Sequence, residues 1–109
     1  MFPKKLKLSI EEFPKRSTFC FRGEKLSLKR APNRHEYSRF GVVVSKKTSP
    51  KATVRNWVKR QVYNFLGKHL GETPRGIDLL VVVGGHIIET NSDTKNALYA
   101  ELEKGIKAL

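Results

Sequence analysis

Two continuous runs of mostly β-branched residues, separated by one amphipathic segment, constrain the fold of this chain more than any other feature. The runs are "RFGVVVS", residues 39–45, and "IDLLVVV", residues 77–83. Such runs are typical of central strands that are buried on both faces. Between them, Ser49 is a candidate N-cap and Pro50 a candidate first residue of a helix that extends to about residue 66 or 70. A strand, a helix and a strand in succession predict a parallel pair that the helix crosses over.

Shorter elements complete the pattern. Residues 18–21 and 25–29 alternate in polarity and predict half-buried strands, with a turn at Gly23. Residues 30–38 are polar, contain Pro and Asn, and predict a loop. A last helix should begin near Asn91 or Ser92, with a core stripe of Leu98, Leu102, Ile106 and Leu109. The sequence therefore predicts a single α+β domain over residues 1–109, a two-layer β-β-β-α-β-α sandwich with a split β-α-β core.

The N-terminal residues carry weaker signals. Residues 1–8 are basic and are expected to be loosely ordered. Ser9 and Glu12 have the spacing of a capping box, and Pro14 limits any helix there to about one turn. The N-terminus has no apolar run long enough for a signal peptide or a membrane span. Because Cys20 is the single cysteine, an intramolecular disulfide is impossible, and we expect a cytoplasmic location.

The charge of the chain is strongly positive and unevenly distributed. Lys and Arg number 22 against 10 acidic residues, which gives a net charge of +12. Residues 1–76 carry 19 basic and 5 acidic side chains, a net of +14, whereas residues 77–109 carry 3 and 5, a net of −2. Such an excess destabilises a compact domain by self-repulsion and usually indicates a polyanionic partner. We therefore expect the first two thirds of the chain to contact that partner.

The helix predicted between the two long runs has two faces. On a helical wheel that starts at Val54, residues Val58, Val62 and Phe65 fall at about 40°, 80° and 20°, forming one apolar stripe. The remaining side holds a cationic band that contains no acidic residue. Its members are Arg55, Asn56, Lys59 and Arg60, with Lys51 and Tyr63 extending it and Lys46 and Lys47 just before the helix.

A charge run of this kind is in most proteins only a solvated helix face. Here the band has no acidic partners at helical spacing, so nothing offsets the repulsion between its cations. Arginines bind phosphate with two hydrogen bonds, and Asn56 within the band could bond a base edge or a ribose hydroxyl. These features favour an RNA-binding surface.

The sequence does not predict a protein active site. The acidic residues are scattered, and Glu11 and Glu12 are neighbours that cannot face one site on a helix. The three histidines lie far apart, and His69 falls on the apolar stripe, where a core or helix-end role is favoured. We therefore expect no catalytic residue and no metal ligand in this chain.

Residues 39–60, "RFGVVVSKK…PKATVRNWVKR", resemble the signature of the bacterial ribonuclease P protein subunit. That signature is a "GxxVSKK"-like strand end, a short gap, an Ala, and a helix with an "RNxxKR" core. Residues 74–82, "PRGIDLLVV", resemble the family's next segment, a charged turn followed by an apolar strand. The resemblance covers residues 39–83 well and residues 9–38 loosely.

The resemblance implies a function. The family's subunit binds a catalytic RNA, and together they remove the 5′ leader of precursor tRNA by hydrolysing one phosphodiester. The RNA carries the chemistry with Mg²⁺, and no cofactor is bound by the protein alone. By position, Arg55, Asn56, Lys59 and Arg60 would face the RNA. The resemblance also implies a left-handed crossover between the parallel strands, against the usual rule.

The chain departs from the family pattern in two places. The motif often reads Arg-Asn-Arg, but its third position here is Trp57, for which packing on the sheet is favoured over stacking; an Arg common one turn later is Tyr63 here. The family's first helix carries two aromatics that line the leader cleft, and only the first is matched, by Phe13. The helix is expected to be truncated, so Phe19 and Phe21 are alternative cleft aromatics, although core packing is favoured for both.

Two other hypotheses compete with a ribonuclease P subunit. A structural RNA-binding protein of the ribosomal type, with no role in tRNA processing, would have a similar composition and core. Adsorption to a membrane surface is disfavoured, because the sheet already accounts for the apolar face of the basic helix. No obligate protein partner is evident.

Overall fold

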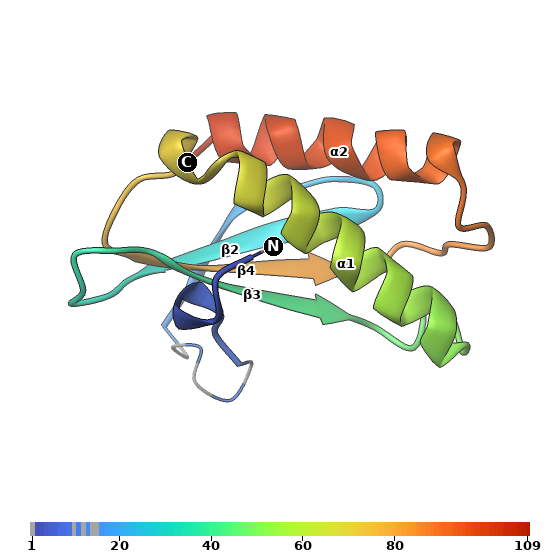
Figure 1. Ribbon diagram of the computed structural model, residues 1–109, viewed down its shortest axis with the longest axis horizontal. Coiled ribbons are helices and arrows are strands. Elements are labelled where there is room, and N and C mark those ends of the chain that lie inside the picture. Colours follow the sequence, from blue (N-terminus) through green and yellow to red (C-terminus); the bar gives the residue numbers. More distant parts are fainter. Residues whose placement is uncertain (1, 10, 12, 14–15) are drawn as a thin grey trace.

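The computed structural model describes residues 2–9, 11, 13 and 16–109, and shows a four-stranded sheet with two helices on one face (Figure 1). In chain order the elements are η1 (Lys4–Leu6), β1 (Thr18–Arg22), β2 (Leu26–Pro32), β3 (Arg39–Val44), α1 (Ala52–Lys68), η3 (Leu70–Glu72), β4 (Ile77–Val83) and α2 (Ser92–Lys107). This order confirms the predicted β-β-β-α-β-α succession and the two-layer α+β class. The short helix predicted after Ser9 lies outside the described residues, because Ile10, Glu12 and Pro14 are not among them.

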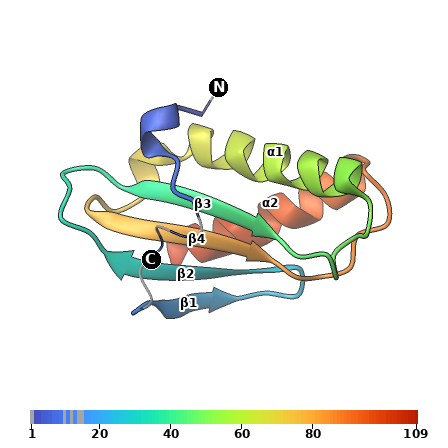
Figure 2. The ribbon, with the colours of Figure 1, turned by 90° about the horizontal axis from the view of Figure 1, so that it is seen from below.

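The sheet has the strand order β1-β2-β4-β3. β2 runs antiparallel to both β1 and β4, whereas β3 runs parallel to β4. α1 connects these two parallel strands on the helical face, and the two views together show that this crossover is left-handed (Figures 1 and 2). That handedness is rare and agrees with the family resemblance. β3 and β4 are direct neighbours, so the expected split of the β-α-β core by another strand is not observed.

The hydrophobic core lies between the sheet and the helices. Alternate residues of each strand face the helices, as the two-residue period of a strand requires. On the strands and both helices, the side chains that are fully buried include Leu26, Leu28, Leu79, Val81, Val83, Val58, Val62, Leu98 and Leu102. The predicted apolar stripe of α1 is confirmed, because Val54 and Phe65 are buried as well. Of the predicted stripe, Leu98, Leu102 and Ile106 are buried in α2, whereas Leu109 lies beyond the end of α2 and is half-buried.

The start of α1 differs from the prediction. The helix begins at Ala52, and its N-cap residue is Lys51, which makes no side-chain cap hydrogen bond. Ser49 Oγ instead accepts a hydrogen bond from the backbone N–H of Lys51 at 3.2 Å. A serine that closes a local turn with the residue two positions on competes with its use as a helix cap. The first helical turn therefore begins after Pro50.

β2 is longer than the alternating pattern indicated. It extends through Pro32, whereas residues 30–38 were predicted as a loop. The extra residues Arg30, Ala31 and Pro32 lie opposite the first half of β4 and so continue the antiparallel ladder. Pro32 is tolerated because it is the last residue of the strand.

The remaining helix begins at Ser92 as predicted, with Asn91 Oδ1 accepting the backbone N–H of Thr94 at 3.0 Å. None of the helices in the described ranges has the length and hydropathy that a membrane span requires.

Candidate nucleic-acid interface

The cationic side of α1 lies at the surface of the helical layer. Lys51, Asn56, Lys59 and Arg60 are exposed, and Arg55 is half-buried. Lys46 and Lys47 are exposed on the connection that leads from β3 to this helix. We call these seven residues the basic patch. The structure thus places every predicted RNA-binding side chain where a large partner can reach it.

The connection from β3 to α1 is fixed to the sheet by a buried threonine. Thr48 Oγ1 donates a hydrogen bond to the carbonyl of Val83 at 3.0 Å, and the Thr48 carbonyl accepts the N–H of Ile87 at 2.9 Å. The Thr48 amide also closes a turn with the carbonyl of Ser45 at 3.0 Å. Because this turn holds Lys46 and Lys47 between Ser45 and the anchored Thr48, it presents both cations from a preorganised backbone.

Arg55 differs from its neighbours in the basic patch. Its Nη1 donates to the Ser49 carbonyl at 2.9 Å, across the first turn of α1. The guanidinium therefore has a structural role, and its remaining N–H groups are available for a phosphate. Replacement of Arg55 would disturb the helix start as well as remove a charge.

No acidic side chain neutralises the basic patch in the part of the chain that the structure describes. The ion pairs formed there join Arg39 to Asp78, His69 to Glu72 and Lys107 to Glu103. Close cations without counterions repel one another, and the repulsion is relieved when phosphates bind and release their own counterions. The electrostatics of α1 thus suit a polyanion.

The face of the sheet opposite the helices, the open face, carries an exposed aromatic. Phe19 of β1 is 43% exposed and lies opposite Lys29 of β2. The Lys29 ammonium and the Arg22 guanidinium lie 4.6 and 4.1 Å from the centre of the Phe19 ring. An aromatic ring between two cations can stack a base and hold its phosphate. The predicted core packing is wrong for Phe19.

Core packing is confirmed for Phe21, which is half-buried against the helical face. The register of β1 against β2 shifts between Phe19 and Phe21, so the two rings point to opposite sides of the sheet. Such a bulge re-aims a side chain, and nothing in the alternation of "TFCF" predicted it. Phe13, the first cleft candidate, is half-buried.

Tyr63, another cleft candidate, lies on α1 beside the N-terminal segment. Its ring packs on Phe2 with centroids 5.0 Å apart, and Lys7 lies 4.9 Å from its centre. Burial raises the pKa of the Tyr63 phenol above its ordinary value, and a hydrogen bond with the Val42 backbone acts in the opposite direction. The structure therefore brings Tyr63 together with the N-terminal segment and not with Phe19.

The N-terminal segment reaches the open face at the edge strand. Leu8 is buried, and its amide donates to the carbonyl of Phe40 at 2.8 Å. A Cβ at Gly41 would lie 2.7 Å from the Leu8 carbonyl oxygen, so this close approach depends on glycine. β1, the next strand, forms the opposite edge of the sheet (Figure 2). Leu8 is thus fixed to β3, the edge strand farthest from Phe19 of β1.

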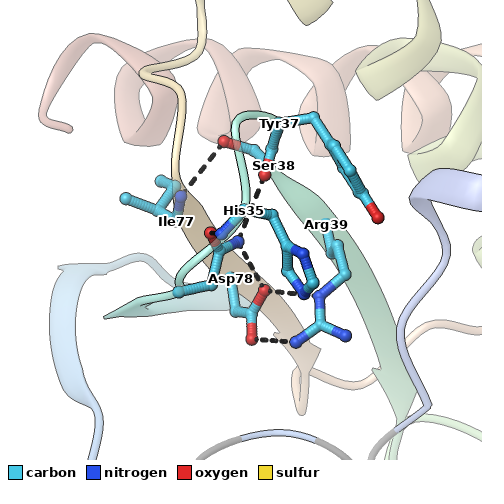
Figure 3. Close-up of polar contacts among 7 residues, drawn as sticks. His35, Tyr37, Ser38, Arg39, Ile77 and Asp78 are labelled. Atoms are coloured by element: carbon cyan, nitrogen blue, oxygen red, sulfur yellow. Dashed lines mark hydrogen bonds and ion pairs between the residues drawn. The ribbon is translucent and has the colours of Figure 1, made fainter.

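One buried ion pair, which the sequence analysis did not predict, links β3 and β4 at the open face. Asp78 of β4 is fully buried, and Arg39 of β3 donates to its two carboxylate oxygens at 2.9 and 2.8 Å (Figure 3). Asn33 donates a third hydrogen bond to Asp78 at 2.9 Å and a fourth, at 3.3 Å, to the Tyr37 carbonyl. The signal for this pair was the single carboxylate in the otherwise apolar run "IDLLVVV".

Among the described residues, no three His, Cys, Asp or Glu side chains gather as a metal site. His69 lies at the C-terminal end of α1, as a helix-end residue. Its Nδ1 is 2.8 Å from the Phe65 carbonyl oxygen, and its ring stacks on Phe65 with centroids 3.9 Å apart. These contacts account for the histidine on the apolar stripe.

The left-handed β3–α1–β4 unit, its basic helix and the open sheet face together define the class, a two-layer α+β domain built like bacterial RNase P proteins. The chain matches the RNase P protein of Thermotoga maritima with a TM-score of 0.69 at 24% identity, covering 87% of this chain and 86% of that one. The match to the Staphylococcus aureus RNase P protein has a TM-score of 0.74 at 17% identity, covering 94% and 93%. At these identities the likeness establishes the fold.

The sequence comparisons establish the family. The family model described as Ribonuclease P matches residues 12–109, so the chain belongs to the Ribonuclease P family. The ribonuclease P protein component of Synechocystis sp. is 42% identical over 48 residues, which is 44% of this chain and 39% of that protein. That of Cyanothece sp. is 36% identical over 83 residues, 75% of this chain and 61% of that protein. The matches thus span less than two thirds of the length of these relatives. The resemblance stated from residues 39–83 is confirmed.

Proposed function

We propose that this protein is the protein subunit of ribonuclease P and assists removal of the 5′ leader from precursor tRNA. The observation that carries the proposal is the family match over residues 12–109, which includes the basic patch. In this proposal the basic patch binds the catalytic RNA, and the open face with Phe19 contacts the leader. A folded, unneutralised cationic surface and an exposed aromatic between two cations are the features that support these two roles.

The proposal assigns the hydrolytic step to the RNA and its Mg²⁺ ions, within the cytoplasm. The protein's contribution is to position the catalytic RNA and the leader of the precursor tRNA, and to reduce the electrostatic repulsion between these two RNAs. Such a contribution should matter most when magnesium is scarce, because the cations of the protein then replace divalent ions in screening the phosphates.

The test is cleavage of a precursor tRNA by a bacterial ribonuclease P RNA at low magnesium, with and without this protein. We expect the protein to restore cleavage at the leader junction. The proposal fails if cleavage is unchanged while the protein still binds ribosomal RNA fragments, which would favour the structural RNA-binding alternative.

The basic patch can be tested separately through the salt dependence of RNA binding. Lys59→Ala and Arg60→Ala each remove one exposed cation, so both variants should still fold. The slope of log K against log salt is negative, and each lost phosphate contact should make it less steep by roughly 0.7 to 0.9. Lys104→Ala on α2 removes one charge outside the basic patch and is the matched control. Equal slopes for all three variants would mean that the basic patch is solvated surface.

A further inference from the structure

Trp57, the residue that departs from the family motif, is only partly used by the core. It is the single tryptophan of the chain, is half-buried, and packs against the core cluster. The rest of its surface lines a cavity of about 360 Å³. The other residues that line the cavity are Thr53, Val54, Asn56, Arg60 and Thr90. The predicted packing role therefore describes only part of this side chain.

Helical geometry explains why these side chains meet. Counted from Val54, residues Asn56, Arg60, Thr53 and Trp57 fall at about 200°, 240°, 260° and 300°, a continuous strip along α1. Thr90 comes from the connection between β4 and α2, which lies at the end of the molecule where α1 begins (Figure 1). The hydrogen bond from the Ile87 amide to the Thr48 carbonyl fixes that connection to the segment that leads from β3 into α1. The cavity therefore has walls that belong to the anchored fold.

The chemistry of the lining selects the kind of ligand. An indole surface stacks flat aromatic groups, the Asn56 amide offers both a donor and an acceptor, and the Arg60 guanidinium binds phosphate. The two threonine hydroxyls add further polar contacts, and no carboxylate lines the cavity. Asn56 and Arg60 also belong to the basic patch, so a ligand in this cavity is continuous with a polyanion bound along α1.

We propose that this cavity receives one unstacked nucleobase of the RNA bound to the basic patch. The base stacks on Trp57, its polar edge meets Asn56, and the adjoining phosphate pairs with Arg60. Recognition of single-stranded or bulged nucleotides by an aromatic ring and an amide is a common mode for RNA. The inference rests on the proposed function, because it assumes that RNA covers this side of α1.

The single tryptophan makes the proposal directly measurable. The protein is titrated with a short uridine oligomer and with an abasic ribose-phosphate oligomer of equal length, while Trp57 fluorescence and the anisotropy of a labelled oligomer are recorded together. We expect the uridine oligomer to quench Trp57 and the abasic oligomer to bind without quenching. Binding of the uridine oligomer without quenching, equal quenching by the abasic oligomer, or no binding of the uridine oligomer would each overturn the proposal.

Variants separate stacking from folding effects. Asn56→Ala keeps the indole and removes an exposed side chain, so it should weaken uridine binding more than abasic binding. Trp57→Leu should lower the affinity for uridine by about 5- to 150-fold, the range expected for one stacked base. Lys104→Ala on α2 removes a charge outside the basic patch and should leave the quenching at saturation unchanged. Loss of quenching in Lys104→Ala, or unchanged uridine affinity in Asn56→Ala and Trp57→Leu, would refute the site.

The cleavage assay tests the proposed function separately from the base site. If this protein restores precursor cleavage but Trp57 does not respond to bases, the proposed function stands and the cavity is not a base site. If it neither restores cleavage nor binds the ribonuclease P RNA, the proposed function itself fails.

Discussion

Replacement of Asp78 by Asn tests the most buried polar feature of the fold. Asp78 is fully buried and accepts two hydrogen bonds from Arg39 and one from Asn33. Loss of the carboxylate charge removes the ion pair that Asp78 forms with the Arg39 guanidinium, whose side chain is only 22% exposed. Breaking a buried pair in this way costs about 3 to 5 kcal/mol, and the partial exposure of Arg39 puts the expected loss near the lower end, at about 3 kcal/mol. That is a large part of the roughly 5 to 15 kcal/mol that stabilises a domain of this size.

Urea unfolding followed by circular dichroism measures this loss. With a slope of about 1 to 2 kcal/mol per molar urea, Asp78→Asn should lower the unfolding midpoint by roughly 1.5 to 3 M. Asp93→Asn removes an exposed carboxylate from the first turn of α2 and should cost less than about 1 kcal/mol. A loss below about 1 kcal/mol in Asp78→Asn would refute the view that this ion pair holds β3 and β4 in place. Because the pair is not part of the basic patch, the affinity of the folded variant for RNA bound at that patch should be unchanged.

Two further predictions concern the contacts of α1 and α2. Burial raises the pKa of the Tyr63 phenol in the folded protein, so as pH rises the unfolded chain loses this proton before the folded protein does. The stability that the neutral phenol contributes is therefore lost as pH rises above about 10. Tyr63→Phe should weaken that alkaline loss in unfolding curves measured at several pH values, and an identical pH profile in both proteins would contradict the burial of the phenol. Glu101 accepts the backbone N–H groups of Lys25 and Leu26, so Glu101→Ala should destabilise the protein by about 1 to 3 kcal/mol and accelerate hydrogen exchange at those two amides. Unchanged exchange there would show that the carboxylate does not hold the hairpin. Glu103→Ala, two residues further along α2 on its exposed side, is the control.

The two faces of α1 were predictable because each depends on local spacing alone. Val54, Val58 and Val62 follow the helical period and are buried, whereas Lys59 and Arg60 between them are exposed. The two long strands were also predictable, because each is a continuous apolar run. The left-handed crossover was predicted from the family resemblance and not from local spacing. The predicted start of α1 was wrong. The Ser49 hydroxyl could either cap the helix or close a local turn with the Lys51 amide, and only the folded structure decides between the two.

The sequence by itself determined the fold class and the side of the molecule that carries positive charge, since hydrophobic period and charge are written residue by residue. The tertiary structure decided what depends on register and on contacts between distant segments. A one-residue bulge in β1 turns Phe19 outward while Phe21 stays inward. The pairing of β3 with β4 brings Arg39 to Asp78, and the anchored connection before α2 brings Thr90 to Trp57. These contacts join residues that are far apart in the chain, so no local pattern encodes them.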